Sequence, residues 1–258
     1  MTPEAHRADD EPARLFRGDE RLGQFMGTGS FAEMMLVHES GCVPIRPDMP
    51  LDRACLIACC VSTGFGAVTN SAQVRAGETV AVIGCGGVGL AAINGAAVAG
   101  ASRIVAIDRL PGKLDMAKLF GATDTIDASA GNVVEQMMEL TGGRGIDHAF
   151  EAIGRKETIE AAFAILAKGG LATVVGASRP DLKVELPALA FLREKRIQGS
   201  MMGSVRLAID VPRYVDLYLQ GRLKLDELIS QRLTLDQINK GFDDMRAGNV
   251  ARSVILFD

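Results

Sequence analysis

The chain has 258 residues, of which 48% are hydrophobic and 23% charged, with a formal net charge of −4 and a pI of about 5.5. This length can bury a large core, and the slight acidity speaks against nucleic acid or an anionic membrane as a partner. No apolar run reaches the roughly 18 residues of a spanning helix, and the charged start has no apolar stretch of the kind that secretory signals carry.

The five cysteines are odd in number and mostly clustered, which argues against a disulfide framework and for a reducing, cytoplasmic location. They include no C-x-x-C pair, so a four-cysteine structural zinc site is not encoded. The cysteines are Cys42, Cys55, Cys59, Cys60 and Cys85.

The first part of the chain gives weak signals. Residues 1–20 are predicted to be a flexible lead-in, and strand-like segments follow at 31–38 and 42–45. After a Pro-containing turn, Asp52 is expected to cap a short helix that runs towards Cys60.

From Gly77 onward, strand and helix signals alternate, and the strands are continuous apolar runs. Such runs are typical of a parallel sheet that helices cover on both faces, so the pattern predicts a doubly wound α/β fold. Strands are expected at 79–84, 103–108, 123–126, 147–152, 171–176 and 195–201, and helices at 87–99, 112–120, 131–140 and 156–167.

After Gly203 the rhythm changes. A helix is expected at 206–220 and a strand at 228–233, then a helix that the capping box Thr234–Gln237 opens, and a final strand at 252–257. We expect this tail to form a second unit together with residues 21–60.

A glycine motif follows the first strand of the alternating part. Gly84, Gly86 and Gly89 match G-x-G-x-x-G between an apolar run and an Ala-rich helix, and Asp108 ends the next apolar run. In this pattern the glycines allow a tight turn, a close approach of backbone to a pyrophosphate, and close helix packing, while the acid accepts bonds from a ribose hydroxyl. The motif therefore predicts a dinucleotide site on the N-terminus of the helix.

Several segments together resemble the zinc-dependent medium-chain alcohol dehydrogenases. They are LIACCVSTGFGAV (56–68), VAVIGCGGVGLA, IVAIDRLPGKLDMAKLFGATD, FEAIGR (150–155) and AGNVARSVILF. The resemblance runs from about Arg14 to the end of the chain. It implies a Rossmann domain at 61–203 that is flanked by remnants of a GroES-like β domain, at 21–60 and in the C-terminal segment 204–258.

The resemblance also implies roles in NAD binding. Thr63 and Val88 would pack on opposite sides of the nicotinamide, and this makes Thr63 the one candidate for a catalytic residue. Asp108 favours NAD over NADP, and we interpret the neighbouring Arg109 as a solvated charge at the same rim. The remaining candidates for cofactor contacts are Gly84, Gly86, Gly87, Gly89, Lys113, Ile153, Arg155, Val175, Gly176, Ser200, Met202 and Arg252.

Cys59 stands where the family has the third ligand of its catalytic zinc. That site takes two cysteines and one histidine, but the family's Gly-His-Glu segment is absent, and the chain has only His6, His38 and His148. We therefore expect the chain to be the C-terminal part of such an enzyme and not to retain zinc by itself.

The function that follows from the resemblance is hydride transfer between NAD and a primary alcohol or aldehyde, in a chain that binds NAD but is catalytically incomplete. Two alternatives stay open: a non-catalytic dinucleotide-binding or dimerisation module, and a zinc-free medium-chain reductase. The segment 196–201 resembles the edge strand through which the family pairs two subunits, so a homodimer is expected.

Overall fold

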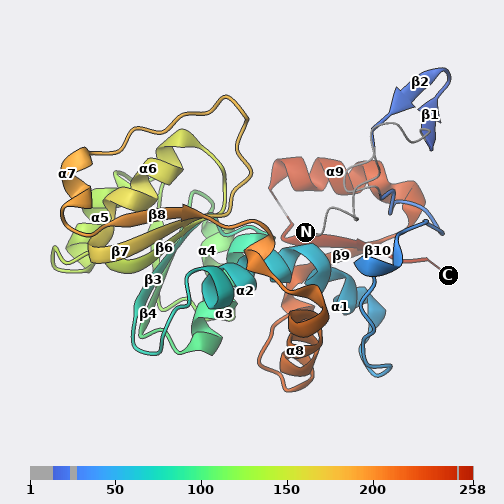
Figure 1. Cartoon of the computed structure of the whole chain (residues 1–258), viewed down its shortest axis with the longest axis horizontal. Helices are drawn as coiled ribbons and strands as arrows, with labels where there is room; N and C mark the ends of the chain where they lie inside the picture. The colour runs from blue at the N-terminus through green and yellow to red at the C-terminus, as the bar shows by residue number, and fades with distance from the viewer. Residues whose placement is uncertain (1–13, 24–27, 249, 258) are drawn as a thin grey trace.

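Six parallel strands form the central sheet of the computed structural model, which describes residues 14–23, 28–248 and 250–257 (Figure 1). The strand order is β5-β4-β3-β6-β7-β8, so the chain starts in the middle, builds one half outward, and returns to build the other. The expected doubly wound α/β fold is confirmed, with its topological switch point between β3 and β6. The strands are β3 (Thr79–Ile83), β4 (Arg103–Asp108), β5 (Asp124–Asp127), β6 (Ile146–Glu151), β7 (Leu166–Val174) and β8 (Arg196–Gly199).

Successive side chains of each strand pack into two separate cores, one on each face of the sheet, because side chains alternate across a sheet. In β3, Val80 and Val82 join the core on one face, whereas Ala81 and Ile83 join the core on the other. Helices α3 (Gly87–Ala99) and α4 (Pro111–Phe120) cover the first face, and α5 (Val133–Leu140) and α6 (Lys156–Ala164) cover the second. The short helix α7 (Ala188–Phe191) precedes the edge strand β8.

The boundary between α6 and β7 differs from the prediction. The helix expected to reach residue 167 ends at Ala164, and β7 begins at Leu166, so Gly169 and Gly170 lie inside the strand. Gly169 has a φ of +77°, and a Cβ on Gly170 would lie 2.9 Å from the Ile146 carbonyl oxygen. The two glycines therefore serve a strand irregularity and a close strand contact, not a helix end.

A helix of 21 residues, Leu51–Ser71, crosses the middle of the molecule (Figure 1). It contains α1 (Leu51–Leu56) and α2 (Ser62–Gly66), each followed by a π-helical stretch. The helix expected to end near Cys60 therefore continues to Ser71, because its second half is buried in the core. By length and composition this helix could cross a membrane, but 56% of its apolar window is buried inside the molecule, as in a core helix.

The start of this helix also differs from the prediction. Pro50 occupies the position before the first turn, and Asp52 lies within that turn, so Asp52 is not the cap. Its carboxylate instead contacts the guanidinium of Arg53, at 2.7 Å, and that of Arg232, at 2.9 Å. Asp52 therefore ties the helix to the C-terminal part of the chain.

The strands expected at 31–38 and 42–45 do not form. Between residues 28 and 45, the one regular element of the described chain is a 3₁₀ turn at Glu39–Gly41. Phe31 instead packs edge-on against Phe242, with ring centroids 5.8 Å apart, and Val43 packs against the core. The apolar pattern thus reflects a loop that lies over other elements and has no strand to pair with.

Part of the expected lead-in is an exposed hairpin of β1 (Leu15–Arg17) and β2 (Glu20–Leu22).

The elements of the C-terminal tail, here called the C-terminal unit, lie beside the sheet (Figure 1). It contains α8 (Leu207–Leu219), β9 (Ile229–Leu233), α9 (Ile238–Ala247) and β10 (Arg252–Ile255), and β9 and β10 pair in parallel. The predicted capping box is present, since Gln237 Oε1 accepts the N–H of Thr234 at 3.1 Å. This unit brings Arg252 back towards the glycine motif.

Candidate functional site

The glycine motif forms a loop between β3 and α3. Gly84 has a φ of +97°, in the left-handed region where glycine carries no steric penalty. A Cβ on Gly89 would lie 1.8 Å from the Gly84 carbonyl oxygen, so a larger residue would push the helix off the strand. A Cβ on Gly86, in contrast, would meet no atom of the described chain within 4 Å. There is therefore open space beside Gly86, directly before the first turn of α3, where the helix N-terminus favours an anion.

Asp108 lies at the end of β4, directly beside this loop. Its Oδ2 accepts the N–H of Cys85 at 2.8 Å, and its Oδ1 accepts those of Arg109 and Leu110 at 2.7 and 3.1 Å. The carboxylate thus holds both the glycine loop and the turn after β4. The Arg109 side chain is exposed at the rim of the site.

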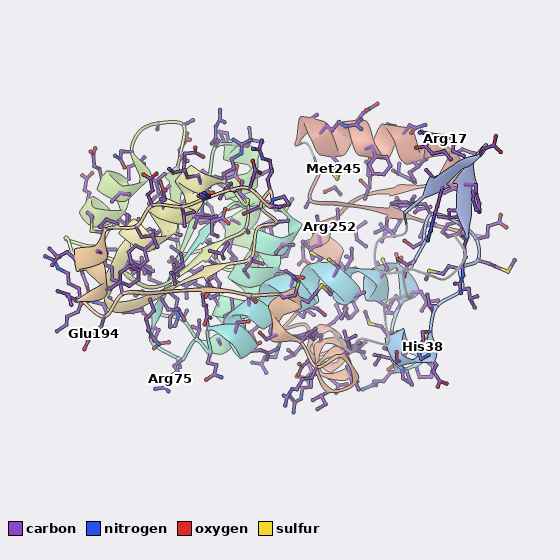
Figure 2. All side chains as sticks on the ribbon, turned by 45° about the horizontal axis from the view of Figure 1, so that its top comes forward. Arg17, His38, Arg75, Glu194, Met245 and Arg252 are labelled. Atoms are coloured by element: carbon purple, nitrogen blue, oxygen red, sulfur yellow. The ribbon has the colours of Figure 1, made fainter. Side chains whose placement is uncertain are left out.

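Two cations approach the loop from other parts of the fold. A Cβ on Gly87 would lie 2.4 Å from Cζ of Arg252, so the guanidinium covers the first turn of α3. Figure 2 shows Arg252 between the sheet and the C-terminal unit. The ammonium of Lys113 lies 3.9 Å from the Cβ position of Gly248, at the end of α9. Burial raises the pKa of the Cys85 thiol in the loop, and the charge of Lys113 partly opposes this effect. Positive charge therefore collects where the helix N-terminus already favours an anion.

The loops after β6 and β7 close the other side of the glycine loop. The side chain of Ile153 lies against Gly84, where a Cβ would be 2.6 Å from Ile153 Cγ1. A Cβ on Gly176 would lie 2.2 Å from the amide nitrogen of Gly154, so these two loops touch backbone to backbone. Val175 follows the last residue of β7, and Arg155 is exposed at the start of α6.

A second cluster of predicted residues lies at the N-terminal end of α3. A Cβ on Gly64 would lie 2.1 Å from the Val88 carbonyl oxygen, so α2 and α3 are in close contact. Thr63, one residue earlier, donates its hydroxyl to the sulfur of Met202 at 3.7 Å. The Ser200 hydroxyl lies 2.7 Å from that of Ser71 in the helix. The predicted residues thus form two groups: one surrounds the glycine loop, and the other joins Thr63 and Met202 beside Val88 of α3. Ser200, in contrast, lies beside Ser71, farther along the long helix.

Cys59, the candidate metal ligand, is not part of a cluster of metal-binding side chains within the described residues. Cys59 is exposed on the long helix. Burial raises the pKa of the neighbouring Cys60 thiol, and the Arg252 guanidinium partly opposes this effect. His38 is exposed, and His148 bonds Glu78 at 2.9 Å, whereas His6 lies outside the described residues. Within the described ranges no group of three or more His, Cys, Asp or Glu side chains could hold a metal. The donors around Cys59 therefore do not fit zinc, which takes three or four protein ligands.

Glu151 belongs to the site but was missed in the sequence. It ends β6 and is completely buried. Its Oε1 accepts three hydrogen bonds from the turn and helix that follow. A charged residue at the carboxyl end of an otherwise buried strand was the available signal, because buried charges are rare without partners.

Comparisons with known proteins point to one family. The family model described as zinc-binding dehydrogenase matches residues 87–220. "Alcohol dehydrogenase class-3" of Myxine glutinosa is 39% identical over 249 residues, which is 95% of this chain and 66% of that protein. "Probable S-(hydroxymethyl)glutathione dehydrogenase 1" of Schizosaccharomyces pombe is 40% identical over 248 residues, 95% of this chain and 65% of the relative.

Solved structures give the same result. Benzyl alcohol dehydrogenase from Acinetobacter calcoaceticus superposes with a TM-score of 0.87 at 31% identity, over 91% of this chain and 64% of that one. A zinc-binding domain protein from Burkholderia ambifaria, described as an alcohol dehydrogenase, has a TM-score of 0.87 at 33% identity, over 91% and 63%. The chain thus spans about two thirds of the length of the relatives that it matches.

Proposed function

The chain belongs to the zinc-binding dehydrogenase family, and on that basis we propose that it is an NAD-dependent oxidoreductase by descent, which binds NAD(H). The reaction of the complete site is hydride transfer between the nicotinamide and a primary alcohol or aldehyde. One observation carries the proposal: Gly86, Asp108 and Arg252 come from three distant parts of the chain and meet at the N-terminus of α3.

The residues at this point suit a dinucleotide. The open space at Gly86 and the guanidinium at Gly87 suit a pyrophosphate, for which the fork of donors of Arg252 is well shaped. The carboxylate of Asp108 accepts ribose hydroxyls and repels a 2′-phosphate, which favours NAD over NADP. In this proposal Ile153 contacts the adenine, and Lys113, Arg109 and Arg155 lie at the rim of the adenosine end.

We assign the nicotinamide to the second group of residues. Bound NAD supplies the ring carbon that gives or takes the hydride. Thr63 and Val88 pack on the two sides of the ring, and this orientation is what the protein contributes to the reaction rate. The main-chain groups of Val175 and Gly176 lie at the carboxyl end of β7, where open α/β sheets bind ligands. The main chain at Ser200 and Met202 provides further contacts for the carboxamide.

The donor set at Cys59 limits the activity that we propose. Since the described residues do not fit zinc, no step is assigned to a metal. We infer that this chain binds NAD(H) and by itself turns over little or no alcohol.

Titration of the purified chain with NADH, followed by nicotinamide fluorescence, tests cofactor binding. We expect saturable binding, and its absence at millimolar NADH contradicts the proposal. Metal analysis tests the second half: we expect much less than one zinc per chain, and unchanged NADH affinity after treatment with a chelator. Stoichiometric zinc together with chelator-sensitive alcohol oxidation contradicts it.

A second candidate function is a non-catalytic dinucleotide-binding or dimerisation module. It is favoured by β8, which lies at the edge of the sheet and pairs with β7 alone among the described strands. We propose that two copies pair along 196–201 to form a homodimer. Light scattering behind a sizing column checks this, and a monomer at micromolar concentration contradicts it.

We propose the same division of the chain that the sequence suggests, with 61–203 as the cofactor domain and 21–60 and 204–258 as parts of a GroES-like unit. We also propose a cytoplasmic location for the protein. The zinc-free reductase is the third candidate, and Cys59 argues against it, because such relatives have no need of a cysteine at this position. Measurable carbonyl reduction by the zinc-free chain would favour it over the module.

A further inference from the structure

We propose that Glu151 is a positioning residue for the adenosine half of the dinucleotide, through the turn that carries Ile153. This inference rests on the proposed NAD(H) site and extends it to a buried side chain that contacts no part of the cofactor. Glu151 is the last residue of β6, at the topological switch point of the sheet.

The side chain of Glu151 organises the turn after its own strand. Its Oε1 accepts the N–H of Ile153 at 2.9 Å and that of Gly154 at 2.8 Å. It also accepts the hydroxyl of Thr158, in the first turns of α6, at 2.7 Å. Burial strengthens these hydrogen bonds, because water does not compete for the acceptor oxygen. One oxygen therefore fixes the path of residues 152–154.

The main chain of Glu151 organises the neighbouring loop. Its carbonyl oxygen accepts the N–H groups of Val175 and Gly176 at 2.8 and 2.9 Å. The side chain thus controls the turn after β6, and the carbonyl controls the turn after β7. Substitution of the side chain removes the first set of bonds and leaves the second set in place.

The turn after β6 determines where Ile153 lies. Ile153 is 42% exposed, and its side chain rests on Gly84 of the glycine loop. Gly154 has a φ of +88°, and a Cβ there would be 2.3 Å from the Ala177 carbonyl oxygen, so the turn is held tightly on both sides. When the two N–H groups lose their acceptor, Ile153 is no longer fixed over the loop. The adenosine half of the ligand then loses its contact, whereas the nicotinamide half keeps Val175 and Gly176.

The experiment compares Glu151→Leu, Glu151→Gln and Thr158→Val with the wild-type chain. Calorimetry measures the Kd for NADH and for ADP-ribose, which contains the adenosine end and lacks the nicotinamide. Gln keeps an acceptor oxygen, and Thr158→Val removes one donor while both N–H bonds to Oε1 remain. Ile153→Ala and the double variant with Glu151→Leu test whether the two residues act through one another.

We expect Glu151→Leu to weaken the binding of both ligands by the same factor of about tenfold, as the loss of buried hydrogen bonds implies. Glu151→Gln and Thr158→Val should stay within about threefold of wild type, and the double variant should bind about as well as the weaker single variant. Unchanged ADP-ribose binding in Glu151→Leu, or additive effects in the double variant, overturns the inference.

If Glu151→Leu does not unfold cooperatively, Glu151→Met decides the question, because it keeps the length of the side chain but removes the carboxylate oxygen that accepts both N–H groups. It should weaken ADP-ribose about tenfold, and wild-type affinity in this variant overturns the inference. A wild-type chain that binds neither ligand overturns the proposed function and this inference together. That result is distinct from wild-type binding that the variants do not change.

Discussion

The guanidinium of Arg252 lies against Gly87, the first residue of α3, so closely that a Cβ on Gly87 would be 2.4 Å from Cζ. Arg252 also donates through Nη1 to the carbonyl oxygen of Ala251 at 3.0 Å, and this bond holds its side chain near β10. A positive charge from the end of the fold thus covers the helix terminus that would receive a pyrophosphate.

Arg252→Gln should weaken NADH binding by about tenfold or more, because the charge-assisted contact proposed between Arg252 and the pyrophosphate is lost. Fluorescence titration measures the Kd, and thermal unfolding checks the fold. Arg246→Gln is the matched control, since Arg246 is an exposed cation of the same unit that pairs with Asp243. Equal affinity in the two variants would mean that Arg252 is not part of the site.

Substitution by alanine should have different effects at two glycines of the loop: it should lower stability at Gly89 and weaken NADH binding at Gly86. Gly89→Ala should lower the free energy of unfolding by about 2–3 kcal/mol, because its Cβ meets the Gly84 backbone. Gly86→Ala should change it by less than about 0.5 kcal/mol but weaken NADH binding, because the Cβ enters the space left for the ligand. Urea unfolding and NADH titration separate the two effects. Gly112→Ala, another position with open space, is the control, and equal NADH affinity in Gly86→Ala would contradict this placement of the pyrophosphate.

Asp108→Asn should shift the ratio of NADPH to NADH affinity towards NADPH by about tenfold, because the repulsion of a 2′-phosphate is removed. The free energy of unfolding should also fall by about 1 kcal/mol, since three N–H groups lose a charged acceptor. Paired titrations with both nucleotides measure the ratio. Asp115→Asn, an exposed carboxylate on α4, should leave it unchanged. An unchanged ratio in Asp108→Asn would locate the ribose elsewhere.

Asp147 should account for part of the loss of folding stability at acid pH. Burial by itself would raise its pKa, but hydrogen bonds from the Thr79 side chain and backbone, and the contact with Arg144, lower the pKa below its ordinary value. A carboxyl with a lowered folded pKa stabilises the protein above its unfolded pKa of about 4, and the contribution disappears as the pH falls through the folded pKa.

The stability difference between wild type and Asp147→Asn should therefore be largest near neutral pH and shrink below about pH 4. Urea unfolding across this pH range measures it, with the exposed Asp243→Asn as the control. A difference that stays constant with pH would show that the lost contacts are not ionic in origin.

The alternating part of the fold could be predicted because its signals are local. The bounds of α3 agree with the prediction at both ends, since the helix begins after a glycine loop and ends at Gly100 in the left-handed region. The loop at 28–45 could not be predicted, because exposed apolar residues such as Met34 imitate a strand pattern without a partner strand.

The site was predictable only in part, for a similar reason. The glycine motif and Asp108 follow from spacing, whereas the position of Arg252 depended on the family resemblance, because its contact joins distant parts of the chain. Glu151 was missed because two of its three partners are backbone N–H groups, so its place at the end of a buried strand was the one signal in the sequence.

The pairing of β9 with β10 brings Arg252 to the glycine loop across a large sequence separation. Contacts of this kind close slowly, after the neighbouring strands and helices of the sheet have formed. A partly folded chain can therefore have a complete glycine loop before the guanidinium of Arg252 reaches it. NADH should then select finished molecules from a refolding population, so its fluorescence should rise after the far-UV circular dichroism signal. NADH binding would thus report that the last long-range contact of the fold has formed.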